Sequence, residues 1–279
     1  MSITPPYTRN IKEPQTRSFS IMTSVMLMGF LFAGMMTWNS CKPAGDSNGG
    51  TDGFITIFDG KTLKGWKGDT AYWRVENGHL VGEITPATVL KNNSFIIWQG
   101  GELTDFELTL EFKITAAGNS GINYRSVPVT GLPYALKGYQ ADIDGANNYT
   151  GQNYEERGRT TLAYRGEIVT VNTPENSPAA LNDHIKNNAW LERKVTGTLG
   201  NIDSLKKGIR PEDWNKLNLM VKGKKLQHYI NDVLMSEVID NDTVNGKSSG
   251  LLGVQVHVGP PMKVEFRNIR LRQSGTASL

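Results

Sequence analysis

Apolar and polar residues alternate through much of the chain after about residue 53. In residues 106–114, FELTLEFKI, every second side chain is apolar. Such strict period two is typical of a half-buried β-strand. Residues 213–235, 251–258 and 263–272 show the same alternation with short interruptions. The pattern therefore predicts strands with one face against a hydrophobic core.

Turn-forming residues separate these strands. Asn77-Gly78 and Asn231-Asp232 stand where hairpin tips are expected, and Gly223 marks a further turn. The apolar phase changes between Phe266 and Ile269, which predicts a bulge. Many strands joined by short Gly/Asn turns predict an all-β fold, a β-sandwich or jelly roll.

Residues 145–213 do not follow this pattern. They are rich in Gly and Asn, and their apolar residues are weakly patterned. A stretch of this length between strands is usually a functional loop or an embellishment of the fold. We therefore expect one domain over residues 53–273 that contains a long loop, followed by a short tail at 274–279.

The first forty residues have the features of an export signal. Arg9, Lys12 and Arg17 form a basic start, and residues 19–38 are uncharged and mostly apolar. This run approaches the roughly 20 residues that span a bilayer, so a retained membrane anchor is the alternative.

Cys41 favours a lipoprotein over a plain signal peptide or a retained transmembrane anchor. It is the only cysteine, it directly follows Ser40, and it has no partner for a disulfide within the chain. The sequence Asn-Ser-Cys resembles a lipobox, in which the cysteine is lipidated and becomes the mature N-terminus. We predict a signal peptide at 1–40, a lipid anchor at Cys41, a Gly/Asp/Asn-rich flexible tether at 41–52, and export to the periplasmic or outer-membrane face.

The charge of the mature chain is close to neutral. The full sequence carries a net charge of +3, and residues 1–40 contain three basic residues and one acid, which leaves +1. This balance provides no electrostatic footprint for nucleic acid. Without a polybasic face, contact with a membrane depends on the anchor.

Polar side chains oppose apolar ones on three predicted strands. At 139–144, Tyr139, Ala141 and Ile143 point to one face, and the polar residues between them point to the other. The three polar sets are Asn119, Ser120, Asn123 and Arg125; Gln140, Asp142 and Asp144; and Gln255 and His257. A solvated sheet face would also be polar. Amides, carboxylates, Arg and His together match sugar hydroxyls, which both donate and accept hydrogen bonds.

Two further residues are candidates for the same site. Glu83 follows the first hairpin and is a candidate acid or base, and Trp190 in the long loop is a candidate platform for a sugar ring. The sequence contains no P-loop, no dinucleotide glycine fingerprint, no HExxH and no serine in GxSxG. Nucleophilic Ser or Cys catalysis is therefore not expected.

Several segments taken together resemble one protein family. They are FDGKTLKGW at 58–66, WRVENGHLVGE at 73–83, DFELTLEFKI at 105–114, GNSGINYRS at 118–126, GYQADID at 138–144, residues 213–235 and residues 250–272. The resemblance is to the 3-keto-disaccharide hydrolase domain family, and it covers residues 54–273. It implies a concanavalin A-like or laminarinase-like jelly roll that binds its ligand on a concave sheet, and an exported lipoprotein.

The implied reaction is cleavage of a glycosidic bond in a disaccharide or glycoside already oxidised to a ketone at C3. The ketone acidifies the C2 hydrogen, so a base removes it, the C1 oxygen leaves, and water then adds to the double bond. This route needs a base, a donor for the enolate oxygen and an acid. It does not need the two-carboxylate arrangement of ordinary glycosidases.

The resemblance supplies the candidate site. It matches Glu83, Asn119, Ser120, Arg125, Gln140, Asp142, Gln255 and His257 to the family's polar positions. We assign His257 as the base because imidazole exchanges protons near neutral pH. We assign Arg125 to the oxyanion and Asp142 or Glu83 as the acid, with Asn119, Ser120, Gln140, Asp144, Gln255 and Trp190 as substrate-binding residues. The family often has Glu-Val-Gln where this chain has residues 139–144, so the catalytic set and the substrate stay open.

Two other functions stay open at this point. A laminarinase-type endo-glycanase needs Glu-x-Asp-x-Glu along one strand, whereas this chain has Gln140-x-Asp142-x-Asp144. A non-catalytic carbohydrate-binding lipoprotein would use the same face without a base. No cofactor is required by these readings, although oxygen ligands near Asp142 and Asp144 would suit a divalent ion such as Ca²⁺.

Overall fold

The computed structural model describes residues 52–174, 189–190 and 192–274. The predicted signal peptide, Cys41 and the tether up to residue 51 lie outside these residues. Within the described part the chain forms two packed β-sheets and one short helix, α2 (Ile202–Lys207), so the prediction of an all-β sandwich is confirmed. Among the described residues, no helix has both the length and the apolar composition of a membrane-spanning segment.

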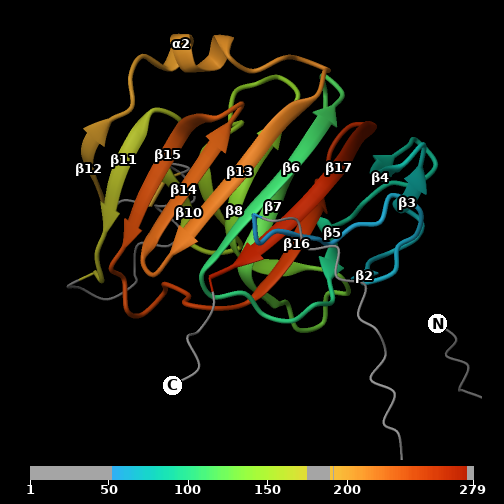
Figure 1. The fold of residues 1–279 in the computed structure, drawn as a ribbon, viewed down its shortest axis with the longest axis horizontal. Helices are drawn as coiled ribbons and strands as arrows, with labels where there is room; N and C mark the ends of the chain where they lie inside the picture. The colour runs from blue at the N-terminus through green and yellow to red at the C-terminus, as the bar shows by residue number, and fades with distance from the viewer. Residues whose placement is uncertain (1–51, 175–188, 191, 275–279) are drawn as a thin grey trace, which may run out of the picture. The chain divides into compact units, whose positions relative to one another are not determined.

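The larger sheet, here sheet A, lies in front in Figure 1. Its spatial order is β12 (Arg193–Thr198), β11 (Glu167–Val171), β15 (Val233–Asp240), β14 (Lys225–Ile230), β13 (Asn215–Lys222), β6 (Phe106–Ile114), β17 (Met262–Gln273), β4 (His79–Ile84) and β3 (Trp73–Glu76), and β1 (Ile55–Thr56) pairs with β17. Sheet B lies behind it in the same view. Its order is β10 (Thr160–Ala163), β9 (Asn153–Glu156), β8 (Leu136–Asp144), β7 (Asn119–Pro128), β16 (Leu251–Val256), β5 (Ser94–Trp98) and β2 (Trp66–Lys67).

The predicted alternation sets the hydrophobic core between the sheets. Leu108, Leu110 and Phe112 of β6 point inward from sheet A, and Tyr139 and Ala141 of β8 point inward from sheet B. Their polar neighbours therefore lie on the outer faces of the two sheets. The outer face of sheet B carries the polar residues of β8.

The predicted turns and the predicted bulge are present. Asn77-Gly78 joins β3 to β4, and Asn231-Asp232 joins β14 to β15, with positive φ at all four residues. The register of β17 against β6 shifts between Arg267 and Arg270, where the apolar phase changes. Positive φ favours Gly, Asn and Asp, which explains these turn sequences.

The prediction of a long loop over residues 145–213 is wrong for most of the described residues there. This region supplies β9, β10, β11, β12 and α2. β10 is buried at all four positions, and β9 at three of its four. A short strand covered on both faces shows no alternation, so its sequence does not have the period-two pattern of a half-buried strand.

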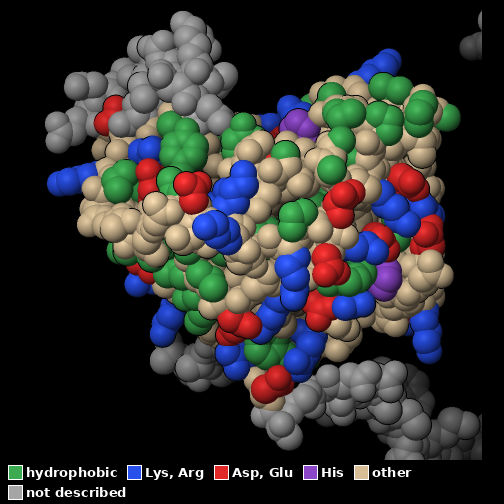
Figure 2. Space-filling model, turned by 90° about the horizontal axis from the view of Figure 1, so that it is seen from above, with side chains coloured by type: hydrophobic (Ala, Val, Ile, Leu, Met, Phe, Trp, Pro, Cys, Tyr) green, Lys and Arg blue, Asp and Glu red, His purple; other side chains and the backbone are tan. Residues whose placement is uncertain are grey.

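The outer face of sheet A carries paired charges. Arg267 lies 2.5 Å from Glu111, Lys113 lies 2.9 Å from Glu265, and Arg272 pairs with Glu107. Opposite charges across neighbouring strands stabilise a solvated sheet face. On the side of the molecule that Figure 2 shows, acidic and basic side chains are mixed and do not form separate acidic and basic patches.

Candidate active site

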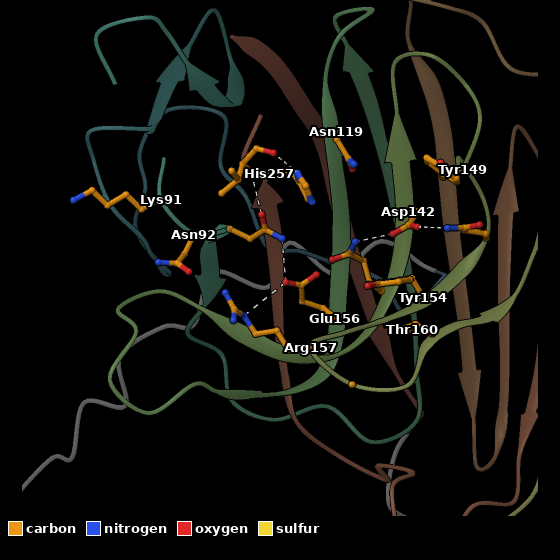
Figure 3. A pocket seen from close by; sticks show the side chains of 15 residues that line it. Lys91, Asn92, Asn119, Asp142, Tyr149, Tyr154, Glu156, Arg157, Thr160 and His257 are labelled. Carbon is orange, nitrogen blue, oxygen red and sulfur yellow. Dashed lines mark hydrogen bonds and ion pairs between the residues drawn. The ribbon is translucent and has the colours of Figure 1, made fainter. Parts of the chain in front are cut away.

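A pocket of about 720 Å³ opens on the outer face of sheet B. Its walls come from the segment before β5, from β7, β8 and β9, and from the residues after β16. Asn119, Asp142, Glu156 and His257 surround it (Figure 3). The pocket therefore joins residues that are more than a hundred positions apart in the sequence.

Asp142 forms the floor of the pocket between two amides. Gln140 Nε2 donates to its Oδ1 at 2.6 Å, and Gln152 Nε2 donates to its Oδ2 at 2.5 Å (Figure 3). The side chain is buried, and burial raises its pKa to about 7, against the lowering effect of the two amides. Asp142 can therefore exist in either protonation state near neutral pH, as acid-base catalysis requires.

Glu156 is a second buried carboxyl group in this pocket. Asn93 Nδ2 donates to its Oε1 at 3.0 Å, and Arg157 Nε lies 3.8 Å from the same oxygen. Burial raises the pKa of Glu156, while Asn93, Arg157 and His257 act to lower it. Sequence reasoning missed this residue because β9 was not predicted. The alternation of Tyr154 and Glu156 toward the pocket is too short to mark a strand.

His257 stands at the pocket wall directly after β16. Its Nδ1 lies 2.6 Å from the carbonyl oxygen of Val258. A carbonyl can only accept, so Nδ1 carries the hydrogen in this contact and Nε2 of the neutral ring has a free lone pair. The Val258 backbone N–H in turn donates to Asn93 Oδ1 at 2.9 Å, which fixes the loop that carries the imidazole.

A buried histidine in the core supports the other side of the pocket. His228 Nδ1 lies 3.1 Å from the Gln152 carbonyl oxygen, and its Nε2 lies 2.9 Å from Tyr124 Oη. Burial lowers the pKa of His228 to about 4, so the ring is neutral and Nδ1 donates to the carbonyl. This contact fixes the backbone of Gln152, whose amide holds Asp142.

The structure brings part of the predicted site together. Asn119, Gln140, Asp142 and His257 all line the pocket. Gln255 lies beneath it, fully buried, and its Nε2 donates to Gln140 Oε1 at 3.0 Å. The catalytic and binding roles of these residues stay predictions.

Two predicted catalytic residues lie elsewhere, and their assignment is corrected. Glu83 lies on β4 in sheet A and pairs with Arg74 at 2.6 Å. Arg125 is 3% exposed and donates to the carbonyls of three residues, Thr104, Gly223 and Lys247, and to Asp105. The register of β7 shifts between Tyr124 and Val127, and Arg125 has φ 45°, so the bulge takes this side chain off the face that alternation predicts.

Three predicted binding residues also lie away from the pocket. Ser120 is fully buried and donates to the Gln255 carbonyl at 2.6 Å. Asp144 accepts backbone N–H bonds from residues 148–150 and so closes a turn. Trp190 is buried and packs in the hydrophobic core.

The described residues do not fit the divalent ion that the sequence left open. The oxygens of Asp142 accept amide N–H groups and those of Asp144 accept backbone N–H groups, which a cation would have to displace. In the part of the chain that the structure describes, no group of three or more His, Cys, Asp and Glu side chains is placed to hold a metal.

Comparison with other proteins gives a family and several similar folds. A 3-keto-disaccharide hydrolase of Bacteroides thetaiotaomicron is 36% identical over 90 residues, which span 28% of this chain and 29% of that protein. The solved structure of a candidate glycosyl hydrolase from Parabacteroides distasonis covers 80% of this chain and 95% of its own, with a TM-score of 0.48 and 17% identity. The carbohydrate-binding module CBM66 of Bacillus subtilis covers 75% and 96%, with a TM-score of 0.45 and 15% identity.

The family match extends over the whole sandwich. Residues 53–272 match the family described as the 3-keto-alpha-glucoside-1,2-lyase-like domain. This range contains every strand of both sheets except the last residue of β17, Gln273, and it contains every residue of the pocket. The chain therefore belongs to the 3-keto-alpha-glucoside-1,2-lyase-like domain family.

Proposed function

We propose that this protein cleaves the glycosidic bond of 3-keto-disaccharides or 3-keto-glycosides by elimination between C1 and C2. The observation that carries the proposal is one pocket in which an imidazole with a free Nε2 accompanies a buried carboxyl group of pKa about 7. Family membership and the name of the Bacteroides thetaiotaomicron relative agree with this chemistry.

His257 is the proposed base. A ketone at C3 acidifies the C2 hydrogen, because the electron pair left at C2 delocalises onto the ketone oxygen as an enolate. His257 Nε2 takes this proton and becomes an imidazolium. Glu156 supplies a negative charge near it, consistent with the electrostatic effect of His257 on the pKa of Glu156.

Asp142 is the proposed acid. As the enolate collapses, the C1–O bond breaks, and the protonated carboxyl gives its proton to the departing oxygen. Asn119 and Arg157, which line the same pocket, offer N–H donors to the enolate oxygen in the role first assigned to Arg125. Water then adds its oxygen to C1 and a proton to C2, which completes net hydrolysis.

The proton at C2 gives a direct test. The purified protein is incubated in D₂O with 3-keto-trehalose or with unmodified trehalose, and the products are followed by NMR. We expect cleavage of the keto-sugar alone, with deuterium at C2 of the 3-keto product. A classical glycosidase would cleave the unmodified sugar and leave C2 protiated, and a binding protein would cleave neither. Cleavage of the keto-sugar without deuterium at C2 would refute elimination.

The role of His257 is tested by substitution. His257→Ala should lower kcat roughly 10²- to 10⁴-fold, the usual value of a positioned general base. His79→Ala is the matched control, since His79 lies on β4 of sheet A and pairs with Glu265. Equal activity of the two variants would contradict the assignment.

A further inference from the structure

The glycine in the middle of β7 lies beside the proposed acid. Gly121 pairs in register with Asp142 on the neighbouring strand β8. Its φ lies outside the left-handed range, so its backbone can be adopted by any residue. The reason for a glycine here must therefore be space rather than conformation.

The space above Gly121 is occupied by the side chain of Gln140. A Cβ added to Gly121 would lie 2.6 Å from both Cγ and Cδ of Gln140, and 2.8 Å from its Nε2. Real Cβ atoms do not come this close to another heavy atom, so any larger residue would displace the amide. Gln140 thus crosses β7 where that strand has no side chain.

This crossing lets Gln140 connect two residues from strands on either side of β7. Gln255 on β16 donates from Nε2 to Gln140 Oε1 at 3.0 Å, and Gln140 Nε2 donates to Asp142 Oδ1 at 2.6 Å. The first bond fixes which end of the amide faces the carboxyl group, because two N–H groups cannot face each other. A flipped amide would place its oxygen against Asp142.

We propose that Gly121 is a positioning residue, whose missing side chain seats the Gln140 amide so that it donates to Asp142 and sets how readily that acid gives up its proton. The seating is independent of the reaction, and only its effect on catalysis rests on the function proposed above. Gln140 and Gln255 act with Gly121 as one unit in this role.

The seating can be tested without substrate. The carboxyl carbon of Asp142 is titrated by ¹³C NMR in wild type, Gly121→Ala, Gln140→Ala and the double variant, with the signal assigned through Asp142→Asn. In wild type the pKa should be about 7. In Gly121→Ala and Gln140→Ala it should rise by about one to two pH units, since a hydrogen bond to the charged form is lost. The double variant should match Gln140→Ala alone.

A glycine in open space provides the control. Gly259 has no heavy atom within 4 Å of an added Cβ, and its φ also lies outside the left-handed range. Gly259→Ala should leave the titration of Asp142 unchanged. The alkaline limb of the pH profile for kcat/KM should move upward in Gly121→Ala by the same amount as the NMR pKa.

Other outcomes would overturn the positioning role of Gly121 or separate it from the proposed function. An unchanged Asp142 pKa in Gly121→Ala, or a double variant that shows the sum of the two single shifts, would overturn the proposal. If Gly121→Ala fails to fold, a folded double variant would support the clash with Gln140, and an unfolded one would overturn it. A shifted pKa in a protein that leaves 3-keto-trehalose intact would refute the proposed function and leave the seating standing.

Discussion

Asp142 should make the folded protein less stable as the pH rises, and its replacement should reverse this effect. The carboxyl group is buried in the pocket floor, and burial raises its pKa from 3.8 to about 7. The folded state therefore binds this proton more tightly than the unfolded state does. The resulting stabilisation is complete at pH values below the unfolded-state pKa of this carboxyl group, about 4, and it is lost as the pH rises through 7.

The magnitude follows from the same two values. A difference of about three pKa units corresponds to about 4 kcal/mol at 1.36 kcal/mol per unit. Asp142→Asn removes the buried charge. Its new amide N–H group, however, faces the N–H group of one of the two glutamine amides that donate to Asp142. Either the Gln152 amide flips, or the Gln140 and Gln255 amides flip together, at a cost of about 1–2 kcal/mol for imperfect hydrogen bonds. We expect a net gain of about 2 kcal/mol at pH 8.5.

Urea unfolding at pH 5 and pH 8.5 measures this gain. Asp142→Asn should be more stable than wild type at pH 8.5 and should show no such gain at pH 5, where wild-type Asp142 is protonated. Asp144→Asn is the control on the same strand face. Its carboxylate accepts three backbone N–H bonds, so the amide should cost about 1 kcal/mol at both pH values. An equal effect of Asp142→Asn at both pH values would refute the reasoning.

The same variant separates the role of acid from that of base. Asp142→Asn should lower kcat roughly 10²- to 10⁴-fold on 3-keto-trehalose, whose leaving oxygen needs a proton. The loss of kcat should be far smaller on a 3-keto-glucoside with a 4-nitrophenolate leaving group, which departs without taking up a proton. A loss of equal size on both substrates would assign Asp142 to the removal of the C2 proton instead.

Three further variants test the surroundings of the pocket. Glu156→Gln should lower kcat/KM roughly tenfold in steady-state kinetics, because it removes the negative charge near the imidazolium. The same variant should be more stable than wild type in urea unfolding at alkaline pH, because burial raises the pKa of Glu156. Arg125→Met should cost about 3 kcal/mol in urea unfolding by leaving buried carbonyls without donors, while kcat/KM of the folded fraction changes less than about twofold. We also propose that the chain is lipid-anchored, so Cys41→Ser should leave the membrane fraction; unchanged fractionation would contradict the anchor.

Long strands with one solvent-exposed face, such as β6 and β13, were predictable from the sequence, whereas the shorter, partly exposed β11 and β12 were not. Residues 106–114 form β6 with the expected boundaries, because polar and apolar positions alternate without interruption. β9 and β10 were missed because they are covered on both faces. Their residues are selected by tertiary contacts, which leave no period in the local sequence.

The pocket was predictable only in part for a related reason. Gln140 and Asp142 follow from the alternation of β8, and His257 follows from that of residues 254–258. Arg125 occupies an equivalent position on β7, but the bulge with φ 45° places its guanidinium among backbone carbonyls. Arginine is uncommon at positive φ, so the sequence carried no signal of this bulge.

Asp142 and Asp144 show most clearly what alternation leaves undetermined. They stand two residues apart on β8 and point to the same face of sheet B, so the sequence treats them alike. The chain after β8 then folds back, and the backbone N–H groups of residues 148–150 bind Asp144, whereas Gln152 turns its amide to Asp142. One carboxylate closes a turn, and the other is held between amides in a buried pocket. Because both environments come from the same returning segment, the chemistry of the site depends on residues 145–152 as much as on the strand itself.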